Sequence, residues 1–209
     1  RRQLTFACEG SLLAGSLDEG DARTGLLIVS GGNELRSGAW SGQAQLAARI
    51  AREGFPVFRF DRRGVGDSEG PNGEFRSSAP DIAAALAAFR AKCPGITRVI
   101  GMGNCDAASA LMLARGEGCD ALILCNPWTI EEPDAAPPPE ALRDHYRRRL
   151  LDPSAIRRLL TGQVSLGKLV SSLKGALAPT PPPAPTGLAV DMAAGIAGFA
   201  GPVVFLLAE

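Results

Sequence analysis

The stretch Val99-Ile100-Gly101-Met102-Gly103-Asn104-Cys105-Asp106-Ala107-Ala108 decides the fold of this 209-residue chain. An apolar strand runs into a turn of small residues, and an alanine-rich helix follows directly. This pattern is typical of a nucleophile elbow, G-x-S-x-G in its common form, in which the nucleophile has a positive φ and its neighbours two residues away must be small. Gly103 and Ala107 meet that requirement, although Ala107 replaces the usual second glycine.

Cys105 stands at the position of the nucleophile and is the candidate catalytic residue. A thiol at a helix N-terminus faces the positive end of the helix dipole, which stabilises the thiolate, whereas the carboxylate of Asp106 opposes this modestly. A buried structural cysteine is the alternative interpretation, and the strand, spacing and helix together favour the nucleophile. The other thiols fall in or beside strands or at a helix end, where packing is the expected role: Cys8, Cys93, Cys119 and Cys125.

Strand-like and helix-like segments alternate on both sides of the elbow, which is typical of a mostly parallel sheet with helices on both faces. Strands are expected at 4–8, 12–17, 26–30, 56–60, 97–101, 121–125 and 202–208, the first two as a hairpin turning near Glu9-Gly10, and helices at 43–53, 81–92 and 107–115. The alternation breaks after residue 127. Residues 128–195 are therefore expected to form a helical cap insertion between two core segments, 1–127 and 196–209, and the core is expected to lack its C-terminal part.

Two turns that follow other strands add to the candidate site. The glycine turn Gly31-Gly32-Asn33 lies where such a sheet supplies one oxyanion-hole amide, and the residue after the nucleophile supplies the second. This assigns the backbone N–H groups of Gly32, with Asn33 as the alternative, and of Asp106, although a glycine pair can also be a simple turn. The loop 61–68 (DRRGVGDS) is interpreted as structural, bordering the site.

The general base is harder to place than the nucleophile. His145 is the only histidine, and it lies in the charged stretch 141–149, where a surface position is favoured. The acid and the base are expected to follow the strand 202–208, which leaves Glu209 a weak candidate for the acid and the histidine beyond residue 209. Asn33 and Trp128 are candidate pocket residues, and Trp128 either lines the pocket or anchors the insertion.

Composition narrows the function classes. Lys plus Arg (22) equals Asp plus Glu (22), so no basic field attracts nucleic acid or anionic lipid, and a small neutral substrate is expected. Five cysteines without paired spacing favour neither a zinc site nor a disulfide framework, and free thiols fit a reducing cytoplasm. The apolar runs are too short for a signal peptide or a membrane span. No metal or organic cofactor is implied.

Four segments carry a resemblance to a known family: Phe6-Ala7-Cys8-Glu9-Gly10, the segment from Arg59 to Gly70, Cys105-Asp106-Ala107-Ala108-Ser109-Ala110, and Asn126-Pro127-Trp128. With them the chain resembles the exosortase A system-associated hydrolases of the first kind, a branch of the α/β-hydrolase superfamily. The cysteine elbow is the most specific of these segments, and the resemblance spans most of the chain. It implies an α/β-hydrolase fold and an enzyme encoded with exopolysaccharide and exosortase systems in Gram-negative bacteria, without supplying a substrate.

The sequence therefore predicts a cytoplasmic hydrolase or acyltransferase that acts on an ester or thioester. Cys105 would attack the carbonyl carbon, and the amides of Gly32 and Asp106 would hold the oxyanion. A non-catalytic protein of the same fold, or an inactive fragment, is the alternative, because a cysteine replaces the usual serine and the base is not located.

Overall fold

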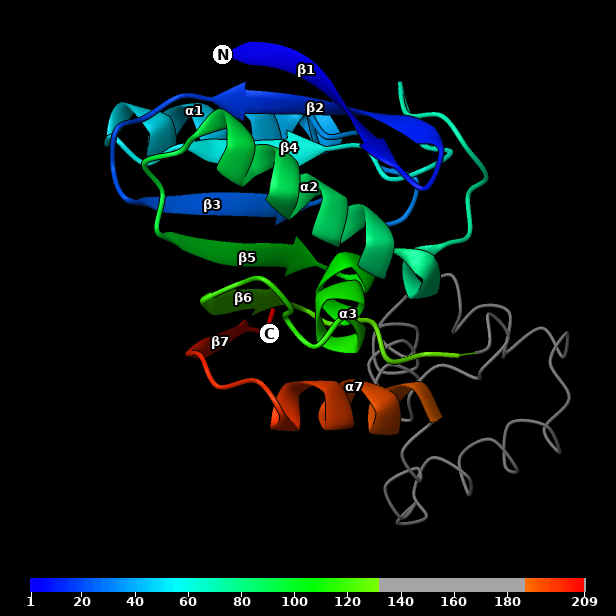
Figure 1. Ribbon diagram of the computed structural model, residues 1–209. Helices are drawn as coiled ribbons and strands as arrows, with labels where there is room; N and C mark the ends of the chain where they lie inside the picture. Colours follow the sequence, from blue (N-terminus) through cyan, green and yellow to red (C-terminus); the bar gives the residue numbers. More distant parts are fainter. Residues whose placement is uncertain (132–186, 209) are drawn as a thin grey trace, which may run out of the picture. The chain divides into compact units, whose positions relative to one another are not determined.

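The computed structural model describes residues 1–131 and 187–208, which form a seven-stranded sheet in the order β1-β2-β4-β3-β5-β6-β7 (Figure 1). The strands are β1 (Arg2–Cys8), β2 (Ser11–Asp18), β3 (Thr24–Val29), β4 (Val57–Phe60), β5 (Arg98–Asn104), β6 (Ala121–Cys125) and β7 (Val203–Leu206). β2 pairs antiparallel with β1 and with β4, and all other neighbours are parallel. The mostly parallel sheet and its entry hairpin are thus confirmed.

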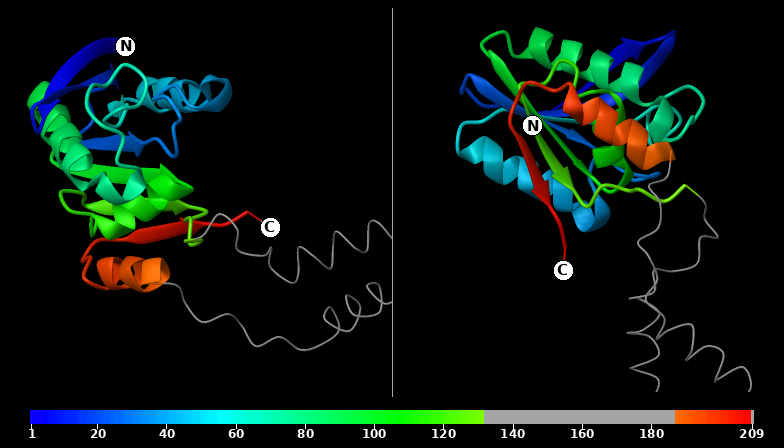
Figure 2. Two further views of the ribbon diagram at one scale, coloured as in Figure 1. Left: turned by 90° about the vertical axis from the view of Figure 1, so that its right-hand side faces the viewer. Right: turned by 90° about the horizontal axis from the view of Figure 1, so that it is seen from below.

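Helices cover both faces of the sheet (Figure 2). They are α1 (Gly42–Arg52), α2 (Ala79–Lys92), α3 (Asp106–Leu113) and α7 (Gly187–Ala197), with two 3₁₀ turns, η1 (Ala39–Ser41) and η2 (Phe75–Ser77). α1 packs on β4 and β2 from one side, whereas α2 packs on β1 and β3 from the other and contacts α3, which in turn contacts α7. Each predicted helix before residue 116 is present, with ends shifted by at most two residues.

Strand β3 shows how one strand serves both faces. Leu26 and Ile28 pack in the smaller core beneath α1, while Leu27 and Val29 belong to the larger core beneath α2 and α3. Successive side chains of a strand point to opposite faces, so a strand covered on both sides reads as a continuous apolar run. This explains why TGLLIV contains no polar alternation.

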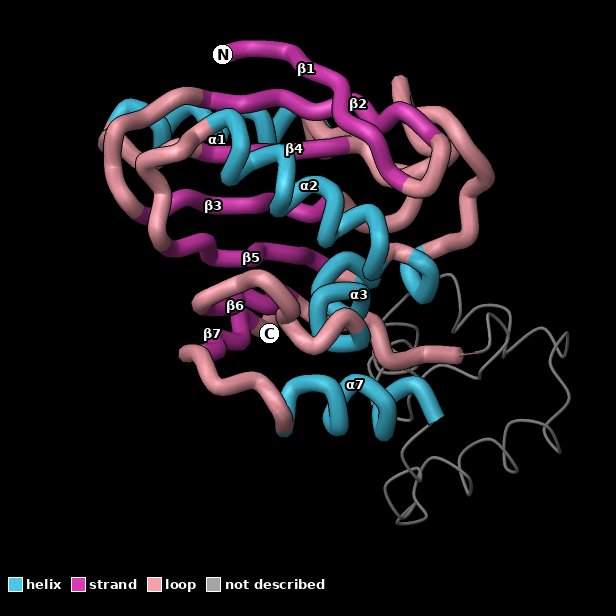
Figure 3. The backbone as a smooth tube through the Cα atoms, viewed as in Figure 1, coloured by secondary structure: helices cyan, strands magenta, loops and turns pink. Residues whose placement is uncertain are grey.

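The parallel strands present their carboxyl ends at one edge of the sheet. The loops after β3, β4 and β5 therefore leave the sheet at this edge, although they are far apart in the chain (Figure 3). Functional groups of open α/β sheets gather at this edge, where a helix begins after each strand. The candidate site residues Gly32 and Cys105 both lie there.

Residues 132–186 and 209 are outside the described residues, and with them most of the predicted insertion 128–195, His145 and Glu209. Helix α7 overlaps the end of the predicted insertion and extends two residues beyond it. It packs against α3 and belongs to the unit of residues 1–129 and 186–209, which contains the sheet. The limits of the insertion and its placement over the strands stay predictions. No helix within the described residues is both long enough and apolar enough to cross a membrane.

Candidate active site

Cys105 lies at the sharp junction between β5 and α3. Its backbone has φ 59° and ψ −128°, a conformation that side-chain-bearing residues rarely adopt. Two sets of hydrogen bonds hold it: its N–H donates to the carbonyl of Cys125 at the end of β6 (2.9 Å), and its own carbonyl accepts from Ala108 (3.1 Å) and Ser109 (3.3 Å) in the first turn of α3. The strained backbone that the elbow pattern predicts is therefore present at Cys105, which is half-buried.

The strand and helix of the elbow touch at Gly103. A Cβ at this position would lie 2.6 Å from the carbonyl carbon of Ala107 and 2.7 Å from the nitrogen of Ala108. Such distances are too short for a side chain, so only glycine lets β5 approach α3 this closely. The small residues on either side of Cys105 thus have the packing role that the sequence assigns to them.

The predicted oxyanion turn lies beside the elbow, and its amide is engaged. Gly32 has φ +52°, and its N–H donates a 2.6 Å hydrogen bond to Oδ1 of Asp106, the residue after Cys105. Gly31 makes the approach possible, because a Cβ there would lie 2.5 Å from the same oxygen. The N–H of Asp106 itself is one of the first amides of α3, which lie outside the helix's own hydrogen-bond ladder. The Gly32 amide is therefore bound to the residue that follows Cys105, and a carboxylate occupies it.

Arg62, from the loop after β4, contacts both Gly32 and Asp106. No motif in the sequence marks it as a site residue. Its side chain is 5% exposed; Nη2 donates to the carbonyl of Gly32 and lies 3.7 Å from Oδ2 of Asp106, and Nη1 donates to Oγ of Ser78 (2.9 Å). Burial lowers the pKa of Arg62, and the charges of Asp106 and Asp81 act in the opposite direction. The sequence offers one signal: Arg62 closely follows a predicted strand, which places it at the carboxyl end of β4.

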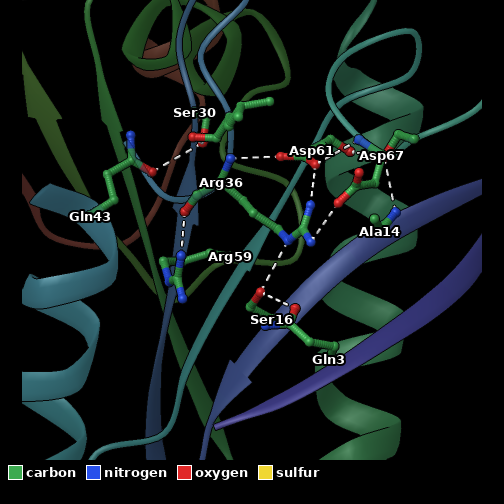
Figure 4. Close-up of polar contacts among 11 residues, drawn as sticks. Gln3, Ala14, Ser16, Ser30, Arg36, Gln43, Arg59, Asp61 and Asp67 are labelled. Carbon is green, nitrogen blue, oxygen red and sulfur yellow. Dashed lines mark hydrogen bonds and ion pairs between the residues drawn. The ribbon is translucent and has the colours of Figure 1, made fainter. Parts of the chain in front are cut away.

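The loop after β3 is further fixed by a buried carboxylate, Asp61 (Figure 4). Asp61 accepts hydrogen bonds from the N–H of Arg36 (2.6 Å) and of Asp67 (3.2 Å) and forms an ion pair with the guanidinium of Arg36. The same guanidinium donates to Ser16 (3.0 Å) and to Asp67 (2.8 Å). These contacts support the structural role expected of the loop 61–68.

The two candidate pocket residues lie on either side of the elbow. Oδ1 of Asn33 accepts a 2.7 Å hydrogen bond from Asn72, which ties the oxyanion turn to the loop after β4. Trp128 is 41% exposed, and its backbone is bound to the elbow: its N–H donates to the carbonyl of Cys105 (3.3 Å), and its carbonyl accepts from Ser109 (2.7 Å). The backbone of Trp128 thus supports the position of Cys105.

The four thiols other than Cys105 share a raised pKa. Burial is the first cause that raises the pKa of each, to about 11 for Cys8 and for Cys119, where the nearby carboxylates of Asp81 and Asp120 add to it. Burial also raises the pKa of Cys93 and of Cys125. These thiols are poor sources of thiolate near neutral pH, in agreement with the packing role expected of them.

Two further observations bear on what the site can hold. In the described part of the chain, no three His, Cys, Asp or Glu side chains gather into a group that could bind a metal ion. Three surface hollows lie elsewhere, two beside Arg1 and one between Leu17 and Ile96, and Cys105 lines none of them. The described residues therefore place the Cys105 thiol, the amides of Gly32 and Asp106 and the Arg62 guanidinium at the carboxyl end of the sheet.

Comparisons with known proteins agree with this architecture. The sequence matches the alpha/beta hydrolase family over residues 26–208, and the chain belongs to this family. The mostly parallel sheet with helices on both faces is the fold that the sequence predicts. A search of curated proteins found no match.

Solved structures of the same fold include several hydrolases. The alpha/beta hydrolase GrgF from Penicillium sp. sh18 is 18% identical, with a TM-score of 0.57 over 100% of this chain and 90% of that one. The Pyrococcus furiosus esterase Pf2001 is 18% identical, with a TM-score of 0.52 over 60% of this chain, and the chain covers 51% of its length. Est1E from Butyrivibrio proteoclasticus, solved with ferulic acid bound, is 20% identical with a TM-score of 0.50, over 59% of this chain and 52% of that one. The chain thus spans about half the length of these two esterases, and at such identities the likeness concerns the fold.

Proposed function

We propose that this protein is a hydrolase or acyltransferase that acts on an ester or thioester, with Cys105 as its nucleophile. The observation that carries the proposal is the backbone of Cys105, with φ 59° at the junction of β5 and α3. A strained conformation costs of order 1–3 kcal/mol and is retained where the surrounding structure requires it, often at catalytic residues. Membership in the alpha/beta hydrolase family and the esterases among its structural neighbours support the same reaction class.

In the proposed reaction the thiolate of Cys105 attacks the carbonyl carbon of the substrate. A C–S bond forms, and the carbonyl electrons move to oxygen, which the amides of Gly32 and Asp106 would stabilise. Collapse of this intermediate expels the alcohol or thiol, which takes up a proton, and leaves an acyl thioester on Cys105. Water or another alcohol then attacks this thioester and frees the cysteine. The described residues contain no histidine, so the general base is expected to be a group outside them.

The proposal also includes a branch of the family and a cellular compartment. The C-D-A-A-S-A motif at 105–110 supports placement in the exosortase A system-associated branch, and the thiols, none of them in a disulfide, favour a reducing compartment such as the cytoplasm. Genes for exopolysaccharide synthesis and an exosortase next to this gene would support the branch assignment. A gene neighbourhood without either would speak against it.

The direct test is hydrolysis of p-nitrophenyl acetate and of an acyl-coenzyme A thioester by the whole protein. We expect Cys105→Ala to abolish turnover and Cys105→Ser to reduce it, whereas Cys93→Ser, which changes a half-buried thiol at the end of α2, should leave it unchanged. Mass spectrometry after brief incubation should find the acyl group on Cys105. Turnover that survives Cys105→Ala would exclude Cys105 as the nucleophile.

A non-catalytic protein of this fold, which binds a ligand or partner, is the second candidate. The observation that favours it is the Gly32 amide, which already has a carboxylate partner in Asp106. Such a binder would leave Cys105 unlabelled by every acyl donor, although iodoacetamide could still modify it. The two candidates are therefore separated by acyl labelling and not by thiol reactivity alone.

A further inference from the structure

The Asp106 carboxylate engages the Gly32 amide, the group to which the proposed function assigns the oxyanion of an acyl intermediate. Its Oδ1 is 2.6 Å from the nitrogen of Gly32, just below the 2.7–3.1 Å range of an oxyanion-hole contact. Asp106 directly follows Cys105, so this anion is attached to the elbow itself. One N–H cannot donate fully to two anions, and a substrate oxyanion would compete with Asp106 for Gly32.

Arg62 stabilises the contact between Gly32 and Asp106. Its Nη2 donates to the carbonyl of Gly32 and lies 3.7 Å from Oδ2 of Asp106, and Ser78 fixes its Nη1. The side chain is almost fully buried, so its charge is poorly screened by water. Arg62 thus orients the Gly32 peptide and also attracts any anion that binds the Gly32 amide.

We propose that Asp106 fills the oxyanion position of the free protein, that it must leave the Gly32 amide before Cys105 can be acylated, and that Arg62 is the positioning residue that keeps this amide aimed at the elbow. This inference rests on the function proposed above. It assigns opposite effects to the two members of one ion pair: Asp106 restrains acylation, and Arg62 promotes it. A merely structural pair would lose activity when either member is changed.

The test compares two reactions of Cys105 in the whole protein. Acylation by p-nitrophenyl acetate passes through an oxyanion, whereas alkylation by iodoacetamide needs the thiolate but forms no oxyanion. The ratio of the two rate constants therefore removes any effect of Asp106 on the thiolate. Because hydrogen bonds to ionised groups are roughly twice as strong as neutral ones, we expect Asp106→Asn to raise this ratio about five- to tenfold.

Asp120→Asn is the matched control. The Asp120 carboxylate also accepts a hydrogen bond from a backbone amide, that of Val99 (2.7 Å), and also lies near an arginine, Arg90 (3.6 Å), but at the other end of β5. Loss of a similar carboxylate far from the elbow should leave the ratio unchanged. Arg62→Lys should lower the ratio several-fold and Arg62→Met further, because neither side chain can bind Gly32 and Ser78 together.

Nuclear magnetic resonance supplies a readout without turnover. The Gly32 amide proton should move upfield in Asp106→Asn and stay in place in Asp120→Asn. An unmoved Gly32 resonance, or a ratio that is unchanged or lower in Asp106→Asn while the unmodified protein is acylated, would overturn this inference alone. Absence of acylation in every variant, Asp106→Asn included, would overturn the proposed function itself, so the two failures can be told apart.

Discussion

Gly103 and Ala107 are in backbone contact: a Cβ on Gly103 would lie 2.6 Å from the carbonyl carbon of Ala107. This contact joins the strand before Cys105 to the helix after it. It requires glycine on the strand side but tolerates alanine on the helix side, where Ala107 is fully buried. The motif in this chain therefore keeps the glycine that the geometry needs.

Gly103→Ala should destabilise the protein by about 1–3 kcal/mol, because the added methyl group must push α3 away from β5. Urea denaturation measures this loss. Gly95→Ala is the control, since a Cβ at Gly95 would meet nothing within 4 Å. Equal stability of the two variants would show that β5 and α3 pack less closely at Gly103 than this distance implies.

Asp61→Asn should lower the free energy of unfolding by about 3–5 kcal/mol, because it leaves the guanidinium of Arg36 without its buried partner. Asp67→Asn removes a carboxylate from the same arginine, but the Asp67 side chain is 74% exposed, and an exposed pair contributes about 1 kcal/mol or less. Chemical denaturation of both variants gives the comparison. A similar loss for the two would contradict the burial argument.

Cys105 should be alkylated before the other four thiols. At pH 8 a thiol with a pKa of about 11, such as Cys8 or Cys119, is ionised in roughly one molecule in a thousand, and iodoacetamide reacts with the thiolate. Peptide mapping after brief alkylation of the folded protein measures the order. Modification of Cys93 or Cys119 ahead of Cys105 would remove the support for Cys105 as the nucleophile.

Stability should fall between about pH 9 and pH 11 because of Cys8. Burial and Asp81 raise the pKa of its thiol from 9.0 to about 11 in the folded protein. The unfolded chain therefore loses this proton first, and the free energy of unfolding, complete below pH 9, decreases as pH rises, by at most about 1.4 kcal/mol per pH unit. Urea denaturation at several pH values should show a shallower decrease in Cys8→Ala than in the unmodified protein. Identical slopes would contradict this assignment.

Much of the sheet could be predicted because its strands obey simple rules. The apolar run of β3 and the small residues around Cys105 each admit few structures, and β6 was placed at its observed bounds, Ala121–Cys125. Helix ends were less accurate: α3 was predicted from Ala107 and begins at Asp106. Helix limits depend on capping and side-chain contacts across the fold, which local periodicity does not contain.

The candidate site was predicted only where a motif marks it. The pattern around Cys105 indicated the elbow, and the glycine turn indicated Gly32, but neither indicated that the Asp106 side chain reaches back to the Gly32 amide. Arg62 was missed for a related reason. Its contacts depend on β4 lying beside β3 in the sheet, a neighbour relation that the order of segments along the chain does not reveal.

The order β4-β3-β5 also has a kinetic consequence. Leu26 pairs with Val57 on one side and with Ile100 on the other, so β3 finds its partners only after long loops of chain have closed. Loop closure of this kind slows folding, because the entropy is lost before the contacts form. The Gly32 to Asp106 hydrogen bond joins residues 74 positions apart across the β3 to β5 junction, so we expect it to form late. Its appearance in a refolding experiment would report the docking of β5 beside β3.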